Sequence, residues 1–334
     1  MSLWILGLLT IFALILGQSV RQRITFVSRL EDRGRLREVA RAGIQKAVVF
    51  LKDGYQESQP FMTAAEKMMR HNNPQQFGPR ALDRGEFEIS FDSESGSSAD
   101  QPQKIYGVQD EESKININKA DPEILRNLIK NVLGWDNSQA QSLANAIRDW
   151  REFGESEATG FYSDEFYDNL KYPYPQKKSD FELLEELLLI KMMNKDIFER
   201  LTPFLTVYGD GKVNMNTASR MVLVSLGFSP GLTSKILSAR RGKDGIEATA
   251  DDYIFIYSYD FYSDLRQFFD LDEDETSQIN ALNARGLLGT GSSHYFIKST
   301  ARLSQGRSAS ISICLYSIKN DGIKYYREAF STIP

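Results

Sequence analysis

Two short segments of the chain share one pattern, Ile115-Asn116-Ile117-Asn118-Lys119-Ala120 and Val213-Asn214-Met215-Asn216-Thr217-Ala218. Each extended run ends at an asparagine, Asn118 or Asn216, whose side-chain oxygen is suited to accept from free N–H groups in a helix's first turn. Helical apolar spacing follows each copy, and a turn with Gly134 or Gly227 leads into a second helical pattern. The sequence therefore predicts two helix hairpins, near 115–151 and 213–241, with Asn118 and Asn216 as N-caps.

Both hairpins lie in a mainly helical region, residues 110–291. Between them, residues 148–178 are rich in tyrosine and proline, and Ser179-Asp180-Phe181-Glu182 then has the spacing of a capping box that opens a helix. Four tyrosines of the irregular stretch are open to two interpretations, a partner surface or local loop packing: Tyr162, Tyr167, Tyr172 and Tyr174.

Strand patterns flank the helical region on both sides. Residues 86–91 alternate apolar and polar side chains, and residues 104–108 can pair back on them as a hairpin. After residue 291, three further strand-like runs are separated by Gln305-Gly306 and by Asn320-Asp321-Gly322. The two ends of the chain thus share one β-strand character.

The N-terminal run from Leu3 to Val20 carries no charge. About 18 helical residues cover roughly 27 Å, close to the thickness of a bilayer core. A signal peptide would need basic residues before this run, whereas Arg21 and further arginines follow it. We predict a transmembrane segment at 1–20, anchored by Leu3, Trp4, Ile5, Leu6, Leu8, Leu9, Ile11, Phe12, Leu14, Ile15 and Leu16.

Beyond this segment, apolar residues keep a helical period from Ile24 to Leu51, and no proline precedes Pro60. We expect one continuous amphipathic rod, the alternative being a membrane span followed by a separate solvated helix. Arginines that follow a membrane span tend to keep the rest of the chain in the cytoplasm. A domain outside the cytoplasm would therefore need basic residues on the other side of the span, before Met1. We therefore expect a leader there.

Composition argues against several classes of function. The net charge is −5 with a pI near 5.4, whereas nucleic-acid binders usually concentrate Lys and Arg into a basic surface. One cysteine and two histidines do not form a zinc cluster. The sequence has no motif of a hydrolase, metalloprotease or nucleotide-binding enzyme, so we expect no enzymatic activity.

Taken in order, these features resemble minor pseudopilin K of type II secretion systems. The specific parts are the stretch FYSDEFYDNLKYPYPQKKSDF at 161–181 and LTPFLTVYGDGKVNMNTAS at 201–219. Family members usually lack the glutamate found at the fifth mature position of other pseudopilins, and Ile5 agrees with this. The resemblance implies an α+β fold in which a long N-terminal helix packs on a small antiparallel sheet.

The same resemblance implies a domain plan and a role. Residues 21–109 would hold the pilin-like helix, connector and first strands, and residues 292–334 would complete the sheet around the insertion at 110–291. The implied role is at the pseudopilus tip, with the soluble domain in the periplasm and a single span in the inner membrane. Implied partners are minor pseudopilins I and J, further H and the major pseudopilin, and prepilin peptidase for leader removal.

Calcium is the cofactor that the resemblance implies for the helical domain. Oxygen ligands are available in one acidic loop at Asp244, Glu247, Thr249, Asp251 and Asp252, and in a second from Asp149 to Glu157. Neither loop has EF-hand spacing, and solvated acidic loops are common, so a plain surface loop remains the alternative.

The rival function is a membrane-anchored DNA-binding protein, for example in DNA uptake. Helix-hairpin-helix modules present backbone N–H groups of a glycine turn to a phosphate. Here Asp136 follows the first turn and Pro230, which lacks an N–H, follows the second. With the acidic pI, these residues make nucleic acid the less favoured partner.

Overall fold

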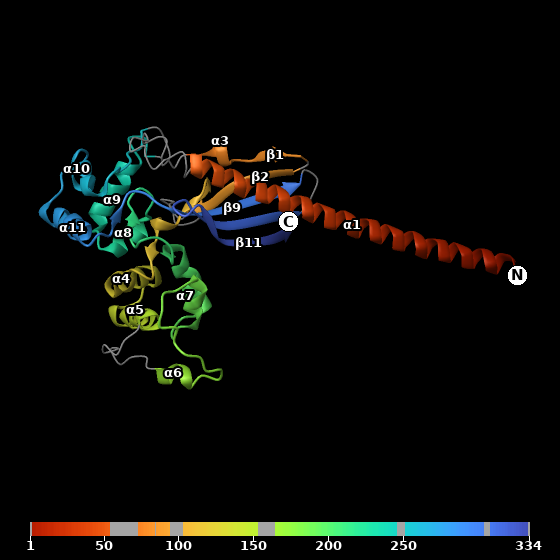
Figure 1. Ribbon diagram of the computed structural model, residues 1–334, viewed down its shortest axis with the longest axis horizontal. Helices are drawn as coiled ribbons and strands as arrows, with labels where there is room; N and C mark the ends of the chain where they lie inside the picture. Colours follow the sequence, from red (N-terminus) through yellow and green to blue (C-terminus); the bar gives the residue numbers. More distant parts are fainter. Residues whose placement is uncertain are drawn as a thin grey trace.

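The computed structural model describes residues 2–53, 73–83, 85–93, 103–152, 164–245, 251–303 and 308–332. Within these ranges ten side chains are not described: Ser2, Leu3, Leu6, Leu8, Ser93, Gln103, Asp164, Glu165, Ser308 and Thr332. The described chain has three parts: a projecting helix, an antiparallel sheet and a cluster of helices at the sheet end opposite the N-terminus (Figure 1).

Helix α1 runs without interruption from Ser2 to Asp53. Its C-terminal part packs on the sheet through residues that recur every three or four positions, and Leu36 is the first buried one. The N-terminal part of α1 projects away from the rest of the molecule (Figure 1). The predicted continuous rod is confirmed, and the alternative of two separate helices is wrong.

The sheet has the strand order β1-β2-β9-β10-β11, with β3 paired to β2 and β4 paired to β9, all antiparallel. The predicted hairpin near 86–108 and the three C-terminal strands are confirmed. Their bounds are β1 Arg80–Leu82, β2 Gly85–Ser93, β3 Gln103–Tyr106, β4 Gln109–Asp110, β9 His294–Leu303, β10 Ser308–Ser317 and β11 Gly322–Thr332. Pairing of β2 with β9 joins the two ends of the chain in one sheet, as the resemblance implied.

Close approach of α1 to the sheet depends on Gly43. A Cβ atom there would overlap Ser299 Oγ of β9 and lie 2.9 Å from the Phe87 ring of β2. At the sheet edge, Arg37 and Arg41 of α1 each form an ion pair with Glu328 of β11, at 2.8 Å. The helix is therefore fixed to the sheet both by a close apolar contact and by charges at its rim. The short helix α3, Pro74–Phe77, adds Phe77 to this core.

The helical region leaves and rejoins the sheet at neighbouring points. Asp110 at the end of β4 lies opposite Tyr295 near the start of β9. In between come two parallel strand pairs, β5 Ile115–Asn116 with β6 Leu205–Thr206, and β7 Val213–Asn214 with β8 Leu288–Gly289. The helices are α4 Pro122–Leu133, α5 Asn137–Arg151, α6 Asp164–Asp168, α7 Lys195–Leu201, α8 Arg220–Leu226, α9 Pro230–Arg240, α10 Phe261–Arg266 and α11 Glu273–Ala284. Short 3₁₀ turns are η1 Glu111–Ser113, η2 Leu184–Leu189, η3 Thr202–Phe204 and η4 Ser258–Asp260.

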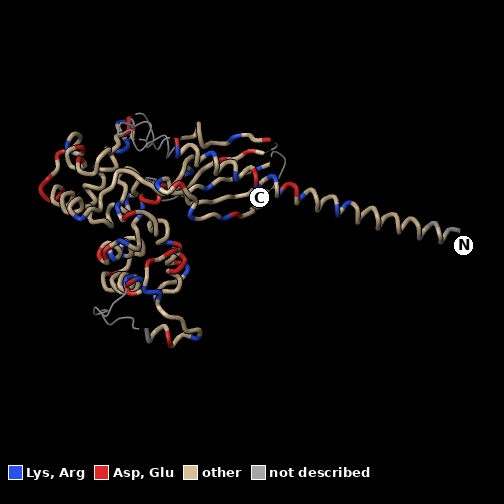
Figure 2. Tube along the Cα trace, viewed as in Figure 1, with Lys and Arg blue, Asp and Glu red and all other residues tan. Residues whose placement is uncertain are grey.

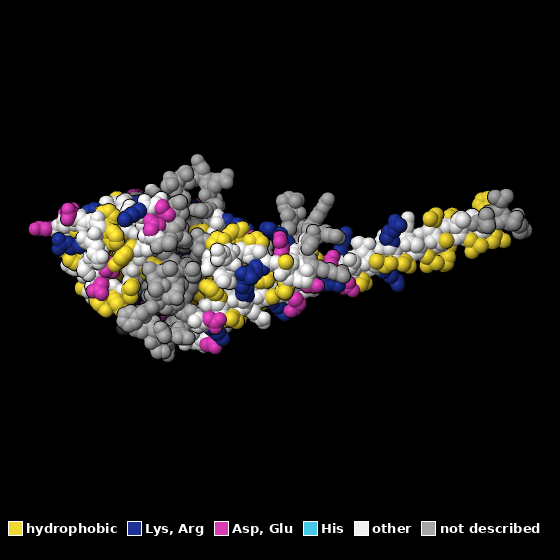
Figure 3. Space-filling model, turned by 90° about the horizontal axis from the view of Figure 1, so that it is seen from above, with side chains coloured by type: hydrophobic (Ala, Val, Ile, Leu, Met, Phe, Trp, Pro, Cys, Tyr) yellow, Lys and Arg dark blue, Asp and Glu magenta, His cyan; other side chains and the backbone are white. Residues whose placement is uncertain are grey.

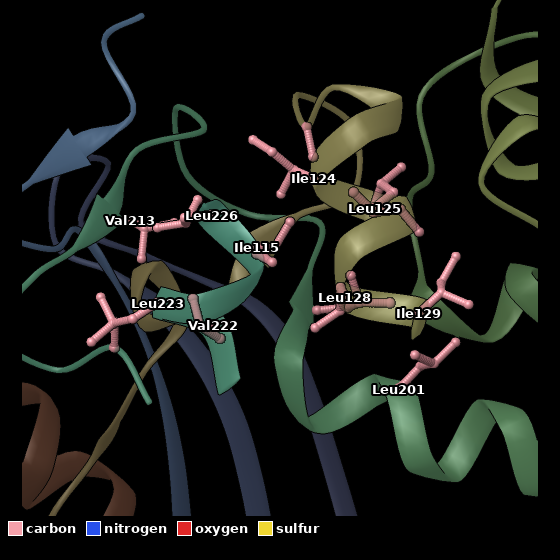
Figure 4. Packing of buried hydrophobic residues seen from close by; sticks show 14 of the residues in the cluster. Ile115, Ile124, Leu125, Leu128, Ile129, Leu201, Val213, Val222, Leu223 and Leu226 are labelled. Carbon is pink, nitrogen blue, oxygen red and sulfur yellow. The ribbon is translucent and has the colours of Figure 1, made fainter. Parts of the chain in front are cut away.

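One apolar core holds both predicted hairpins together. Buried residues of the first hairpin (α4 and α5) and of the second (α8 and α9) belong to the same contact cluster, which also takes in α7 and α11. Figure 4 shows the core side chains of α4, α7 and α8, with Ile115 of β5 drawn between α8 and α4. Both predicted hairpins are confirmed, and the mixed α+β class is confirmed with them.

Candidate functional site

The first asparagine of each repeat shapes the turn between strand and helix. Asn116 Oδ1 accepts from the N–H of Asn118 at 2.9 Å, and Asn214 Oδ1 accepts from the N–H of Asn216 at 3.0 Å. The backbone carbonyl of each first asparagine also accepts from the alanine four residues on, at 2.9 Å. The two repeats therefore share one local geometry, an asparagine-closed turn before the helix.

The second asparagine of each repeat clamps a distant phenylalanine. Asn118 Nδ2 donates to the carbonyl of Phe181 at 2.9 Å and Asn118 Oδ1 accepts its N–H at 2.8 Å. Asn216 makes the same pair of hydrogen bonds with Phe255, both at 2.9 Å. An amide side chain has one donor group and one acceptor, so it matches both polar groups of one backbone residue.

The predicted N-cap role of Asn118 and Asn216 is wrong. The N-cap of α4 is Asp121, and that of α8 is Ser219, whose Oγ accepts from the N–H of Val222 at 3.3 Å. The turn closed by Asn116 or Asn214 occupies the next residues, so each helix begins later than the pattern suggested. Each asparagine instead holds a distant segment of the chain, at Phe181 or at Phe255, against its own repeat.

An arginine at the end of the second helix completes each repeat. Arg151 Nη1 donates to the carbonyl of Ile117 at 2.6 Å and its Nη2 to that of Ala120 at 3.2 Å. Arg240 Nη1 donates to the carbonyl of Ala218 at 2.6 Å. The sequence pattern alone did not indicate this role for either arginine, although each stands at the end of the second helix of its hairpin.

The capping box predicted at Ser179–Glu182 does not open an α-helix. The N–H of Phe181 is already bound to Asn118, and a 3₁₀ turn, η2, begins at Leu184. Glu186 closes this turn by accepting from the N–H groups of Glu182 and Leu183 at 2.8 and 3.1 Å. The prediction of a helix at this point is therefore wrong in type, because the Asn118 contact fixes the chain before the expected cap.

The tyrosine-rich stretch is divided between core and surface. Tyr167 is 1% exposed and packs against Trp150 and Tyr174, with ring centroids 5.8 and 5.6 Å apart. Tyr172 is 76% exposed, and Tyr162 lies outside the described residues. Loop packing is thus the correct interpretation for Tyr167, whereas Tyr172 faces solvent.

Three of the five predicted metal ligands lie together. One carboxylate oxygen from each of Asp244, Asp251 and Asp252 falls within 4.8 Å of the others. Asp251 Oδ2 also accepts from the N–H groups of Lys243 and Asp244 at 2.6 and 3.1 Å, which ties the loop ends together. Glu247 and Thr249 lie outside the described residues.

This donor set fits a hard divalent cation. Calcium takes carboxylate and carbonyl oxygens in irregular loops, and two exposed carboxylates and one buried one converge here. A Cβ at Gly242, whose φ is +61°, would overlap the Asp251 carbonyl, so the loop is held close on its N-terminal side. Asp244, Asp251 and Asp252 are the residues that would hold the ion.

The second acidic stretch has a different character. Asp149 lies near the end of α5, where burial raises the pKa of its carboxyl group. Glu152 caps that helix and lies 3.8 Å from Arg148, while Glu155 and Glu157 are outside the described residues. In the described part of the chain, Asp149 is not brought to the acidic group of Asp244, Asp251 and Asp252.

One N–H group after each hairpin turn is already bound inside the protein. Asp136 accepts from the N–H of Gln139 at 2.8 Å after the first turn. After the second turn, the N–H of Ser229 donates to Gln278 of α11 at 2.8 Å, and Glu275 lies nearby, bound to Lys235. Acidic and basic residues are interspersed over these helices (Figure 2). The geometry does not favour nucleic acid.

The projecting part of α1 carries the predicted anchor residues. Trp4 is 86% exposed, and Phe12 and Leu14 are 60% and 66% exposed. Hydrophobic side chains continue along the rod among arginines (Figure 3). No helix in the described part of the chain combines the length and the apolar character that crossing a membrane requires.

A long N-terminal helix packed on an antiparallel sheet, with a helical domain inserted between two strands, defines a pilin-like subunit. Residues 103–210 match the family model described as type II secretion system (T2SS), protein K. This match confirms the resemblance to minor pseudopilin K. The family is a structural, envelope-associated part of a secretion system.

A solved structure shows the same fold. One chain of the crystal structure of the GspK-GspI-GspJ complex from the enterotoxigenic Escherichia coli type 2 secretion system has a TM-score of 0.57 to this chain. Identity is 13%, over 92% of this chain and 99% of that chain. No curated protein sequence matches this one.

Proposed function

We propose that this chain is the minor pseudopilin at the tip of the type II secretion pseudopilus, where it contributes to filament assembly and protein export. The observation that carries the proposal is the position of its two unusual parts, since the bare part of α1 and the inserted domain lie at opposite ends of the sheet (Figure 1). The bare end is suited to join a helical bundle, and the bulky end is suited to terminate it.

The bare part of α1 needs partners beyond the predicted membrane segment. At about 1.5 Å per residue, the 30 residues from Ser2 to Glu31 extend about 45 Å. Ile24, Phe26, Val27 and Leu30 lie after the uncharged run, and each is at least half exposed. Contiguous exposed apolar residues on one helix indicate a protein-binding surface. Helices of other pseudopilins would cover it.

The inserted domain would prevent another subunit from stacking above it. It rejoins the sheet where β4 and β9 pair, so its whole mass projects from that end (Figure 1). In a filament held together by parallel helices, such a subunit can occupy only the last position. We therefore propose initiation or capping as its role.

The proposed partners are minor pseudopilins I and J, because the structure with the same fold is a GspK-GspI-GspJ complex. Pseudopilin H and the major pseudopilin would occupy the filament positions below this complex. We also propose that residues 3–20 anchor the chain in the inner membrane with the remainder in the periplasm, after prepilin peptidase removes a leader.

We propose calcium as the ion of the loop that contains Asp244, Asp251 and Asp252. When bound, it would neutralise three neighbouring carboxylates, which otherwise repel one another. The loop follows α9, whose Arg240 holds the second repeat. Bound calcium would thus stabilise the second hairpin without taking part in any reaction.

Co-purification tests the assembly proposal. The full-length chain, in detergent, would be co-expressed with candidate pseudopilins encoded near it and separated by size-exclusion chromatography. A stable complex is expected, and the double substitution Val27→Glu with Leu30→Glu should abolish it while leaving the melting temperature unchanged. Gln22→Glu, on the same exposed part of α1, is the matched control.

A duplex-DNA arm at two salt concentrations separates the rival function. Salt-sensitive DNA binding without any pseudopilin complex would overturn the proposal and favour the helix-hairpin-helix alternative. No DNA binding together with loss of the complex in the Glu variants would support the tip subunit.

A further inference from the structure

Three consecutive acidic residues are buried where the chain passes from the sheet into the inserted domain. Asp110 ends β4, and Glu111 and Glu112 open η1; they are 3%, 4% and 6% exposed. A buried carboxylate is costly unless it is paired or hydrogen-bonded. Each of the three is directed to a different part of the molecule.

Asp110 binds the second repeat. Its Oδ2 accepts from Asn214 Nδ2 at 2.8 Å and from Thr217 Oγ1 at 2.5 Å, while its Oδ1 accepts from the N–H of Glu112 at 2.8 Å. Asn214 donates in addition to Ser292 Oγ, just before β9, at 2.9 Å. Asp110 is therefore the direct link between the sheet and the second hairpin.

Glu111 binds the strand β6, which pairs with the first repeat. Its Oε2 accepts from Thr206 Oγ1 at 2.7 Å, and its Oε1 forms an ion pair with Lys114 at 2.7 Å. Since Thr206 pairs with Asn116 in the β5–β6 ladder, this contact reaches the first hairpin. The charge of Glu111 is thus balanced locally by an ammonium group.

Glu112 binds the start of β9. It accepts from the N–H and the hydroxyl of Ser293 at 3.1 and 2.8 Å, and lies 3.0 Å from His294 Nδ1. Tyr208 stacks on the His294 ring, with centroids 5.9 Å apart. A Cβ at Gly209, where φ is +91°, would come within 2.9 Å of Glu112 Cγ, so the turn between β6 and β7 also closes on this carboxylate.

Among the three carboxylates Asp110, Glu111 and Glu112, Asp110 accepts hydrogen bonds only from neutral donors in the described structure. Burial and the nearby charge of Glu112 together raise the pKa of Asp110 to about 6. Hydrogen bonds from Ser292, Thr217 and Asn214 oppose that rise and do not cancel it. Glu112 is the charged group that acts on Asp110 directly. Lys114 pairs with the adjoining Glu111, and His294, on which Tyr208 stacks, lies against Glu112.

We propose that Asp110 is a proton-linked latch between the sheet and the inserted domain, which closes when the carboxyl group is neutral and loosens when it is ionised. Neutral Asp110 can donate through Oδ2 to Thr217 Oγ1 and still accept the N–H of Glu112 at Oδ1. Ionised Asp110 leaves an uncompensated charge beside Glu112. The latch concerns the connection between the sheet and the inserted domain. The proposal does not depend on the assignment of this chain to the pseudopilus tip.

The direction of the pH effect follows from the raised pKa. A carboxyl group that binds its proton more tightly in the folded state than in the unfolded state stabilises the fold at low pH. That stabilisation is complete below the ordinary aspartate pKa and is lost as pH rises through about 6. Between pH 7.5 and pH 5, we expect the closing equilibrium to increase about tenfold.

Hydrogen–deuterium exchange on the full-length chain in detergent tests the latch. Exchange, corrected for its intrinsic pH dependence, would be compared at pH 5 and 7.5 for segments 111–118, 213–218 and 288–295, with β10 as the internal reference. The wild-type chain should gain about tenfold protection at pH 5 in these segments. Asp110→Asn should remove the difference, while Asp53→Asn, at an exposed helix end, should retain it.

Two further variants keep the result decisive if Asp110→Asn fails to fold. Glu112→Gln removes the neighbouring charge, so the midpoint of the protection change should move to lower pH. His294→Gln removes the imidazole that lies 3.0 Å from Glu112, and its response should match that of the wild type. A response lost in His294→Gln, or retained unchanged in Asp110→Asn, would overturn the proposal.

Discussion

At the scale of single residues, the inserted domain depends on polar side chains that connect parts of the chain far apart in sequence. Asn118 and Asn216 each satisfy both backbone groups of a phenylalanine 63 or 39 residues further on. Removing such a side chain leaves a backbone N–H and C=O without their partner. The two clamps are equivalent, so their loss should have similar consequences.

Asn118→Ala and Asn216→Ala should each lower the free energy of unfolding by about 1–3 kcal/mol. Urea unfolding of the full-length chain in detergent would measure this. Asn280→Ala, at an exposed position of α11, is the matched control and should leave stability within about 0.5 kcal/mol. Equal stability of all three variants would show that the clamps contribute nothing.

The acidic loop allows a second prediction at this scale. Asp251→Asn and Asp252→Asn should lower the melting temperature only when calcium is present, because a metal bound to the folded state stabilises it by mass action. The wild-type melting temperature should rise with calcium and return after chelation. Asp274→Asn, an exposed acid on α11, is the control. An unaltered calcium response in both loop variants would remove this site.

At the scale of elements, glycine has opposite effects at two positions of α1. Both Gly34 and Gly43 lie inside the helix, where alanine is favoured over glycine by about 1 kcal/mol. At Gly34 a Cβ would meet nothing within 4 Å, whereas at Gly43 it would overlap Ser299 Oγ. The difference comes entirely from the sheet beneath the helix.

Gly34→Ala should therefore raise the free energy of unfolding by up to about 1 kcal/mol, and Gly43→Ala should lower it by about 1–3 kcal/mol through overpacking. Thermal unfolding in detergent would compare them. Adding Ser299→Gly to Gly43→Ala makes room for the new methyl group and should recover part of the loss. A stabilising Gly43→Ala would mean that α1 does not approach the sheet as closely as described.

At the scale of the whole molecule, the inserted domain is attached at one place. Because Asp110 and Tyr295 face each other across the β4–β9 pair, the insertion occupies the position of a hairpin loop. The sheet and α1 have their own core, separate from that of the helices. The two parts are therefore expected to be independent folding units joined by the acidic junction.

Replacing residues 111–293 by Asn-Gly, which with His294 gives a three-residue connection between Asp110 and Tyr295, should leave the helix and sheet folded. The shortened chain should show a cooperative thermal transition and retain slow hydrogen exchange in β9 and β10, since their backbone pairing is unaffected. An aggregated product, or one without protected amides, would show that the insertion is required for the sheet. The same shortened chain should lose the calcium response.

Local patterns in the sequence are sufficient for the elements themselves. The uninterrupted helical period predicted α1, and strand-like patterns predicted β2 and the C-terminal strands. These signals involve residues a few positions apart, so one sequence contains them. Recognition of the pseudopilin family also came from contiguous stretches.

Contacts between distant segments were decided only by the tertiary structure. The sequence identified Asn118 and Asn216 as important but assigned them to helix caps, because a single chain does not show that Phe181 and Phe255 return to them. For the same reason, the sequence did not indicate the hydrogen bonds of Arg151 and Arg240. It also did not indicate the burial of Asp110, Glu111 and Glu112. A side chain's hydrogen-bond partner depends on which segments meet in space, and the apolar packing of the whole inserted domain determines that.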